Sequence, residues 1–203
     1  MKPKQKARNS YLRHWIVALA LSINGVGGIA HADDPPLALN GIAVYQKLKT
    51  EYYIGALYLA TQQDNPDAAI FKPEHKKMVM KITIPKWRGR QFAKTWQQMI
   101  SVNNDEERLK ESSDSIIAFT RLAKQPLVKG DVIVIESTPE KGTTVSVNGQ
   151  VRIKNGSDKL LSVLLSAWIG DVPPSSEFKR DMLHFDPTNT IQAQWLSELE
   201  SKQ

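Results

Sequence analysis

Few groups in this chain could carry out acid–base or nucleophilic chemistry. It contains no cysteine, which removes thiolate nucleophiles, disulfides and sulfur-ligated metals. After residue 32 the only histidines are His75 and His184, and both lie among charged or polar neighbours. The sequence holds no Gly-x-Ser-x-Gly elbow, no His-Glu-x-x-His motif, no phosphate-binding glycine loop and no dinucleotide fingerprint. We therefore expect neither a metal nor a cofactor.

Aromatic residues in two segments are the better candidates for binding a ligand. Tyr45 and Tyr53 lie in stretches that alternate apolar and polar residues, as strands do. Phe92, Trp96 and Met99 are spaced as i, i+4 and i+7, which places them on one face of a helix. A cleft lined by such residues would suit an acyl chain or another flat apolar molecule. The alternative is that these side chains form ordinary core between helix and sheet.

A cation at the mouth of such a cleft would attract the acidic end of a ligand. Lys47 and Lys49 follow Tyr45 at period-two spacing, which predicts that they share its strand face. The flexible lysine stem can cover apolar surface while its ammonium group reaches a carboxylate. The alternative is that both lysines are solvated on an outward face.

The elements that must position these residues predict an α+β domain. Strands are expected at 37–49, 51–60, 76–84, 130–138 and 143–153. Helices are expected at 87–103, after a cap at 103–105, at 158–169, at 177–183 and within the last twenty residues. Strands on both sides of a helical pair favour one α+β layer over repeated βαβ units.

The first 32 residues have the pattern of a cleaved signal peptide. Five basic residues and no acid precede an apolar run from Trp15 to Ala30, and Ala30-His31-Ala32 stands directly before Asp33. The apolar run is interrupted by glycines and is shorter than the ~20 residues that a membrane-spanning helix needs. We therefore expect export to the periplasm, no transmembrane anchor after cleavage, a domain at 33–184 and a C-terminal helical extension at 185–203.

Removal of this segment changes the charge balance. Five of the 27 Lys and Arg residues leave with it and all 21 acids stay, so the rest of the chain is near neutral. Its charges are mixed rather than gathered on one basic face, and we do not expect a nucleic-acid partner. Arg88, Arg90 and Lys94, near the start of the first predicted helix, could attract an anionic head group. We interpret them as a surface charge run.

Three segments together resemble the chalcone isomerase-like family, in particular its exported bacterial branch. They are Tyr52-Tyr53-Ile54-Gly55-Ala56-Leu57-Tyr58-Leu59-Ala60, the run from Gly142 to Gly149, and Ala167-Trp168-Ile169-Gly170-Asp171-Val172-Pro173-Pro174. The resemblance spans about residues 37–184. It implies an open-faced sandwich, with an antiparallel sheet, helices packed on one face, and a helix–sheet cleft that receives an apolar ligand. Plant members of the family isomerise chalcones, and other members bind fatty acids without catalysis.

The resemblance also shows where this chain departs from the catalytic members. Their cleft arginine falls near Tyr45, their threonine at about Tyr53, their helix tyrosine at Phe92 and the asparagine seven residues on at Met99. Isomerisation needs a cation and hydroxyl donors that stabilise developing charge. Their replacement argues against the plant reaction, and it also weakens the fatty-acid reading, since the family's binders use that arginine for the carboxylate.

Three hypotheses follow. The first is a non-catalytic binder of a small apolar ligand, such as a fatty acid, with Tyr45, Lys49, Tyr53, Phe92, Trp96 and Met99 at the site. The second is an intramolecular lyase or isomerase with Tyr45 and Tyr53 as acid and stabiliser, which requires a tyrosine in the cleft beside a cation. The third is a domain with a filled cleft that acts through its surface on another envelope protein, which predicts no ligand-sized cavity and an exposed apolar patch.

Overall fold

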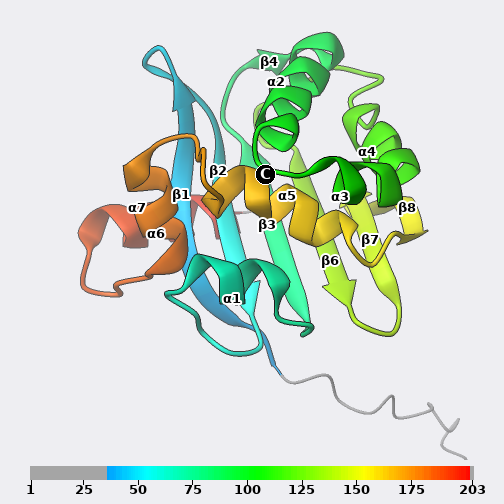
Figure 1. Cartoon of the computed structure of the whole chain (residues 1–203). Coiled ribbons are helices and arrows are strands. Elements are labelled where there is room, and N and C mark those ends of the chain that lie inside the picture. The colour runs from blue at the N-terminus through cyan, green and yellow to red at the C-terminus, as the bar shows by residue number, and fades with distance from the viewer. Residues whose placement is uncertain (1–35, 202–203) are drawn as a thin grey trace, which may run out of the picture. The chain divides into compact units, whose positions relative to one another are not determined.

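Alternating apolar side chains give this domain a sheet that is buried on one face across its width. The computed structural model describes residues 36–201, in which six strands form one open antiparallel sheet (Figure 1). Across the sheet the strands are β1 (Ala38–Lys47), β2 (Thr50–Leu59), β3 (Lys76–Ile82), β6 (Val132–Thr138), β7 (Gly142–Val147) and β8 (Gln150–Gly156). A separate short ribbon pairs β4 (Lys86–Trp87) with β5 (Leu127–Val128). The predicted signal peptide lies outside the described residues.

Six helices contribute to the layer on the buried face. They are α1 (Pro66–Phe71), α2 (Gly89–Ser101), α3 (Glu106–Glu111), α4 (Ser113–Thr120), α5 (Leu160–Ile169) and α6 (Ser176–Leu183). Nine of the ten residues of α5 are buried, because this helix lies across the sheet with other helices around it (Figure 1). The predicted α+β open-faced fold is confirmed.

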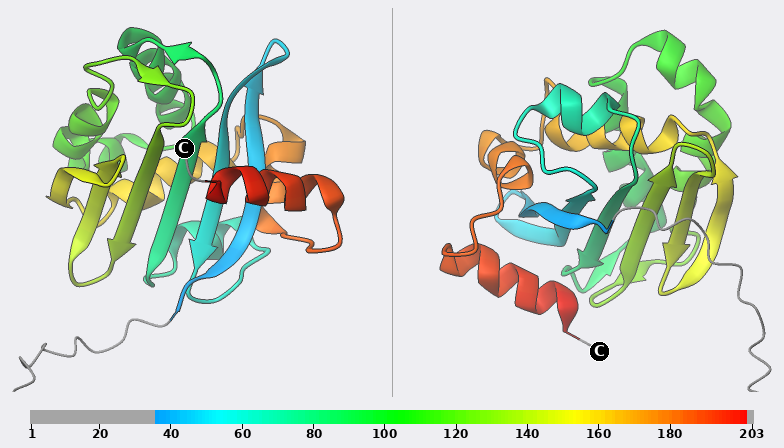
Figure 2. Two further views of the ribbon diagram at one scale, coloured as in Figure 1. Left: turned by 180° about the vertical axis from the view of Figure 1, so that it is seen from behind. Right: turned by 90° about the horizontal axis from the view of Figure 1, so that it is seen from below.

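The C-terminal extension forms a seventh helix, α7 (Thr190–Glu200), on the opposite face of the sheet (Figure 2). There it covers Ile42, Ile54 and Ala56, which alternation points away from the main core. Lys81 closes the end of this helix, since its Nζ donates to the carbonyl oxygens of Glu198, at 2.6 Å, and Ser201, at 2.8 Å. A cation at a helix C-terminus also favours the helix dipole. Helices therefore lie on both faces of the sheet, with α7 on the second face.

Two glycines allow the closest contacts between sheet and helices. A Cβ on Gly55 would lie 2.9 Å from Trp168 Cη2, and a Cβ on Gly41 would lie 2.0 Å from the carbonyl oxygen of Met182. Trp168 and α6 can pack onto β1 and β2 only because both positions lack a side chain.

The structure corrects three boundaries of the sequence prediction. The single strand expected at 143–153 is wrong, because Asn148 and Gly149 adopt φ of 51° and 75° and reverse the chain between β7 and β8. An Asn-Gly pair between apolar runs is a strong hairpin signal. The helix expected to begin at Trp87 begins at Gly89, since Trp87 pairs with Leu127 in the short ribbon. The helix after the cap at 103–105 is divided at Ser112 into α3 and α4.

The turn between β1 and β2 has the same backbone form with less suitable residues. Leu48 and Lys49 have φ of 50° and 64°, although neither is Gly or Asn. Positive φ is unfavourable for residues with a branched or long side chain. Lys47 pairs with Thr50 on either side of this two-residue turn, and the hairpin extends from the sheet (Figure 1).

Replacement of Leu48-Lys49 by Asn-Gly should stabilise the protein. The expected gain is about 1–2 kcal/mol in the free energy of unfolding, because both positions then suit left-handed backbone. Urea denaturation followed by circular dichroism would measure it. The matched control is Gly149→Lys, where φ is 75° and no atom lies within 4 Å of an added Cβ, and this variant should lose stability. A less stable Asn-Gly variant would show that the turn is not strained.

Candidate functional site

Aromatic rings fill the space between β1–β2 and the helices above them. Tyr45 stacks on Tyr53 with ring centroids 5.0 Å apart, and Tyr53 stacks between Trp87, at 6.0 Å, and Trp168, at 6.1 Å. Because β1 and β2 pair Tyr45 directly with Tyr53, the two phenol rings lie side by side on the buried face. This half of the cluster joins two strands to α5.

The second half of the aromatic cluster is built around α2. Phe92 lies 5.1 Å from Trp87 and 5.6 Å from Phe119, and Trp96 meets Phe119 edge to face at 4.9 Å. All four rings are fully buried. The indole N–H groups of Trp87 and Trp96 have no hydrogen-bond acceptor within residues 36–201. Both N–H donors are buried, and the protein offers neither of them an acceptor there.

The phenol of Tyr53 is held in its protonated form. The indole Nε1 of Trp168 donates to its hydroxyl oxygen at 2.9 Å. Burial raises the pKa of Tyr53 well above 10.0, charge on Tyr45 raises it further, and the hydrogen bond from Trp168 opposes part of the shift. Burial, and then charge on Tyr52, raises the pKa of Tyr45. Neither hydroxyl forms a hydrogen bond with a cation within the described residues.

The structure brings most of the predicted site residues together, but as packed core. Tyr45, Tyr53, Phe92 and Trp96 all belong to the aromatic cluster, and Met99 is partly buried against the same core. Their mutual contacts occupy the predicted cleft between helix and sheet.

The predicted strand position of Lys49 is wrong. The strand β1 ends at Lys47, so Lys49 lies beyond the strand and does not share the face of Tyr45. Lys49 instead occupies the turn, where it is exposed. Period-two spacing fails here because the chain reverses direction two residues earlier than expected.

A groove of about 350 Å³ lies where the aromatic cluster reaches the surface, between the β1–β2 hairpin and α2. The side chains around it come from both elements and from β4, namely Lys47, Leu48, Thr50, Tyr52, Trp87, Gln91, Lys94, Thr95 and Gln98. Tyr52 and Trp87 belong to groove and cluster alike, with their rings 5.1 Å apart. Such a volume is at the small end of ligand pockets in proteins.

Two of the groove residues are positively charged and free to meet an anionic group. Lys47 and Lys94 are exposed, and neither forms an ion pair within the part of the chain that the structure describes. Tyr52, by contrast, was missed by sequence reasoning, since strict alternation assigns it to the face opposite Tyr53. The adjacent Tyr52-Tyr53 pair was the available signal.

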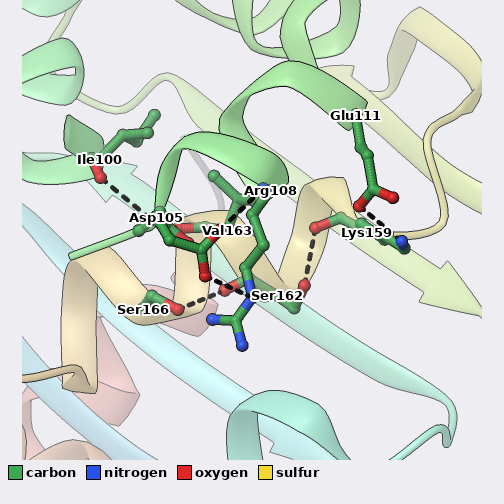
Figure 3. A network of polar contacts seen from close by, with 9 residues as sticks. Ile100, Asp105, Arg108, Glu111, Lys159, Ser162, Val163 and Ser166 are labelled. Atoms are coloured by element: carbon green, nitrogen blue, oxygen red, sulfur yellow. Dashed lines mark hydrogen bonds and ion pairs between the residues drawn. The ribbon is translucent and has the colours of Figure 1, made fainter.

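A second hollow, of about 660 Å³, lies between α1, α3 and α5 and has charged walls. Figure 3 shows part of it: Lys159 Nζ lies 2.6 Å from Glu111 Oε2, and Arg108 Nε lies 3.7 Å from Asp105 Oδ2. Lys72 is likewise paired with Glu74, at 3.0 Å. Because these cations already face acids, the hollow is a poor site for a carboxylate on an apolar chain.

Lys76 also lines this second hollow, and its side chain is hydrogen-bonded to the C-terminal end of α1. Its Nζ donates to the carbonyl oxygens of Ala69, at 2.6 Å, and Ile70, at 3.1 Å. Burial lowers the pKa of Lys76 to about 8, and charge on Glu74 opposes that effect. The side chain thus caps the end of a helix.

A third hollow, of about 780 Å³, is lined by residues of α4, the following loop and the β7–β8 hairpin, and by none from α2, β1 or β2. Among residues 36–201 no cluster of His, Asp and Glu side chains is arranged to hold a metal ion. In the same range no helix has the length and apolar character needed to cross a bilayer. Of these three hollows, the groove beside α2 is the one lined by residues of the aromatic cluster.

Tyr53→Phe should destabilise the protein by about 1–3 kcal/mol, because the buried N–H of Trp168 loses its acceptor. The control Tyr45→Phe keeps a stacked ring and removes a hydroxyl that makes no hydrogen bond within residues 36–201, so its effect should be smaller.

The raised pKa of Tyr53 also makes the stability depend on pH. Above pH 10.0 a tyrosine of the unfolded chain ionises while buried Tyr53 stays protonated, so the free energy of unfolding falls as the pH rises. In the Tyr53→Phe variant, the fall of the free energy of unfolding with alkaline pH should become less steep by up to about 1.4 kcal/mol per pH unit. Chemical denaturation between pH 7 and 11 measures both effects, and an unchanged slope would contradict the burial argument.

Comparison with known proteins agrees with this architecture. The crystal structure of a fatty-acid binding protein of Arabidopsis thaliana matches with a TM-score of 0.56 at 17% sequence identity, and covers 72% of this chain and 86% of that one. No curated protein matches the sequence. The family model described as chalcone isomerase-like matches residues 25–184, which ends before α7. The predicted family is thereby confirmed, and the chain belongs to the chalcone isomerase-like family.

Proposed function

We propose that this protein is an exported, non-catalytic binder of a small apolar ligand with an acidic end, of which a fatty acid is the simplest example. The observation that carries the proposal is the groove between the β1–β2 hairpin and α2. It combines the partly exposed ring of Tyr52, which packs on the buried ring of Trp87, with the ammonium groups of Lys47 and Lys94. An apolar wall with a few polar groups at its edge is the usual composition of a small-molecule site.

The packing of the aromatic cluster supports a ligand at its mouth rather than inside it. A chain bound between Tyr53 and Phe92 would have to displace stacked, fully buried rings and break the hydrogen bond from Trp168. A chain in the groove displaces only water from the partly exposed ring of Tyr52 and from the stems of Lys47 and Lys94. The rim lysines would supply the positive charge that the arginine supplies in other family members.

The fold comparison is consistent with this proposal. The Arabidopsis protein that shares the fold is a fatty-acid binding protein. The export of this chain is part of the same proposal and rests on the signal-peptide pattern before Asp33. N-terminal sequencing of the periplasmic fraction tests the export, since a chain that begins at Met1 would refute it.

Filling of the predicted cleft favours a second candidate, in which the domain acts through its surface on another envelope protein. The large exposed apolar residues offer little support for it, because they are scattered over separate elements rather than gathered on one face, as with Phe71 on α1, Ile117 on α4 and Ile191 on α7. Ligand binding therefore remains the first candidate, and its test decides between the two.

The test is calorimetric titration of the delipidated protein with a saturated fatty acid below its micelle concentration. Lys47→Ala with Lys94→Ala should weaken binding about tenfold, which corresponds to ~1.4 kcal/mol. The matched control is Arg152→Ala with Lys154→Ala, two exposed cations on β8, and it should bind as the parent does. A fatty alcohol of equal length should bind the parent and the double variant alike. If the folded protein binds neither fatty acid nor alcohol, the ligand proposal fails and the surface-interaction candidate takes its place.

A further inference from the structure

The tip of the β1–β2 hairpin combines an exposed leucine with a strained turn and a surrounding basic surface. We propose that this tip docks on an anionic phospholipid membrane, with Leu48 inserted among the lipid head groups and the neighbouring cations against lipid phosphates. The proposal concerns a surface of the protein and does not require a ligand in the groove.

Leu48 is exposed to a degree that no other large apolar residue of residues 36–201 approaches. Its exposed fraction is 91%, whereas the next values are 57% for Val102 and 56% for Val151. It also stands at the end of a hairpin that extends beyond neighbouring strands (Figures 1 and 2). A single leucine at a tip is too small for a protein interface, but it suits insertion into the head-group region of a bilayer.

The backbone of the turn suggests that Leu48 is there for a reason other than stability. Leu48 and Lys49 both have positive φ, in the turn form that Asn-Gly satisfies without strain. The same chain uses Asn148-Gly149 for its β7–β8 turn. Strain of this kind is found where a residue serves a function, so the outlier points to the side chain at the tip.

The charged side chains beside the tip are mostly basic. The turn, β4 and α2 lie at the same end of the sheet (Figure 1). Six exposed cations come from these elements, and none forms an ion pair within the described residues, namely Lys47, Lys49, Lys86, Arg88, Arg90 and Lys94. Residues 84–104 contain no acid at all, and Glu51 is the only acid between residues 38 and 63. Such a surface is complementary to a bilayer rich in anionic lipid.

These features together favour a membrane over a nucleic acid. A phosphate backbone would be bound by the cations alone and would leave Leu48 in water, whereas a bilayer accommodates both. Where the proposed function also holds, an acyl ligand could pass between the bilayer and the groove, since Leu48 and Lys47 belong to the tip and to the groove lining.

The experiment is a vesicle flotation assay with the protein that begins at Asp33, freed of bound lipid. One set of vesicles contains phosphatidylcholine alone, and the other also contains about 30 mol% phosphatidylglycerol, which gives it a negative surface. The protein should float with the anionic vesicles, and raising the salt from about 0.1 to 0.5 M should release it, because salt screens surface charge. Equal flotation with both vesicles, or none with either, would overturn the proposal.

Two variants separate the contributions of leucine and charge. Leu48→Asn relieves the turn and keeps all six cations, and it should reduce the vesicle-bound fraction about fivefold while the protein remains folded. Lys47→Gln with Lys49→Gln should reduce it about as much and lower its salt dependence. The control Val151→Asn changes an exposed apolar residue on β8 and should float as the parent does. Unchanged flotation of Leu48→Asn would refute insertion of the tip.

A direct readout is available because the chain has no cysteine. A polarity-sensitive fluorophore on Leu48→Cys should shift its emission to the blue with anionic vesicles, and the same label on Val151→Cys should not. Because vesicles without free fatty acid are used, a failure here leaves the calorimetric result on the groove untouched. A blue shift at both positions would indicate unspecific adsorption and would contradict the proposed orientation.

Discussion

The contact of Tyr53 with Trp168 is the interaction on which the joining of sheet and helices depends. The two rings stack at 6.1 Å, the indole donates to the phenol at 2.9 Å, and Gly55 leaves room for the indole to lie against β2. Tyr53 then stacks on Tyr45 and Trp87, and Trp87 contacts Phe92 of α2. One hydrogen bond and one missing Cβ thereby fix α5 against the sheet and align the rings around them. Aromatic pairs of this kind contribute beyond the area that they bury.

This packing determines where the proposed ligand can lie. At the positions where the family resemblance implies polar donors and a cation, this chain has rings that contact one another. The cations stand instead on the rim, with Lys47 on β1 and Lys94 on α2. A rim cation can pair with a carboxylate that stays partly in water, where the penalty of desolvating both charges is small. The same rim borders the exposed turn, which connects the proposed ligand site with the proposed membrane surface.

Sequence patterns predicted the fold class and most elements because burial imposes them locally. Met78, Met80 and Ile82 alternate in β3 and share the buried face, and Phe92, Trp96 and Ile100 follow helical spacing and are buried in α2. The same patterns identified which aromatic residues would meet. Spacing cannot tell a lined cleft from a filled one, since Trp96 satisfies either, and that distinction depends on Phe119 and Trp168 arriving from distant helices. Lys49 was misplaced because a turn with two non-glycine residues at positive φ carries no sequence signal.

A crystal structure of the protein with a saturated fatty acid would test the central claim most directly. We expect the carboxylate between Lys47 and Lys94 and the chain against Tyr52, with the hydrogen bond from Trp168 to Tyr53 still in place. A ligand found between Tyr53 and Phe92, with their rings moved apart and that bond broken, would contradict it. In that case the packed cluster would be a closed form of the family's cleft rather than its replacement.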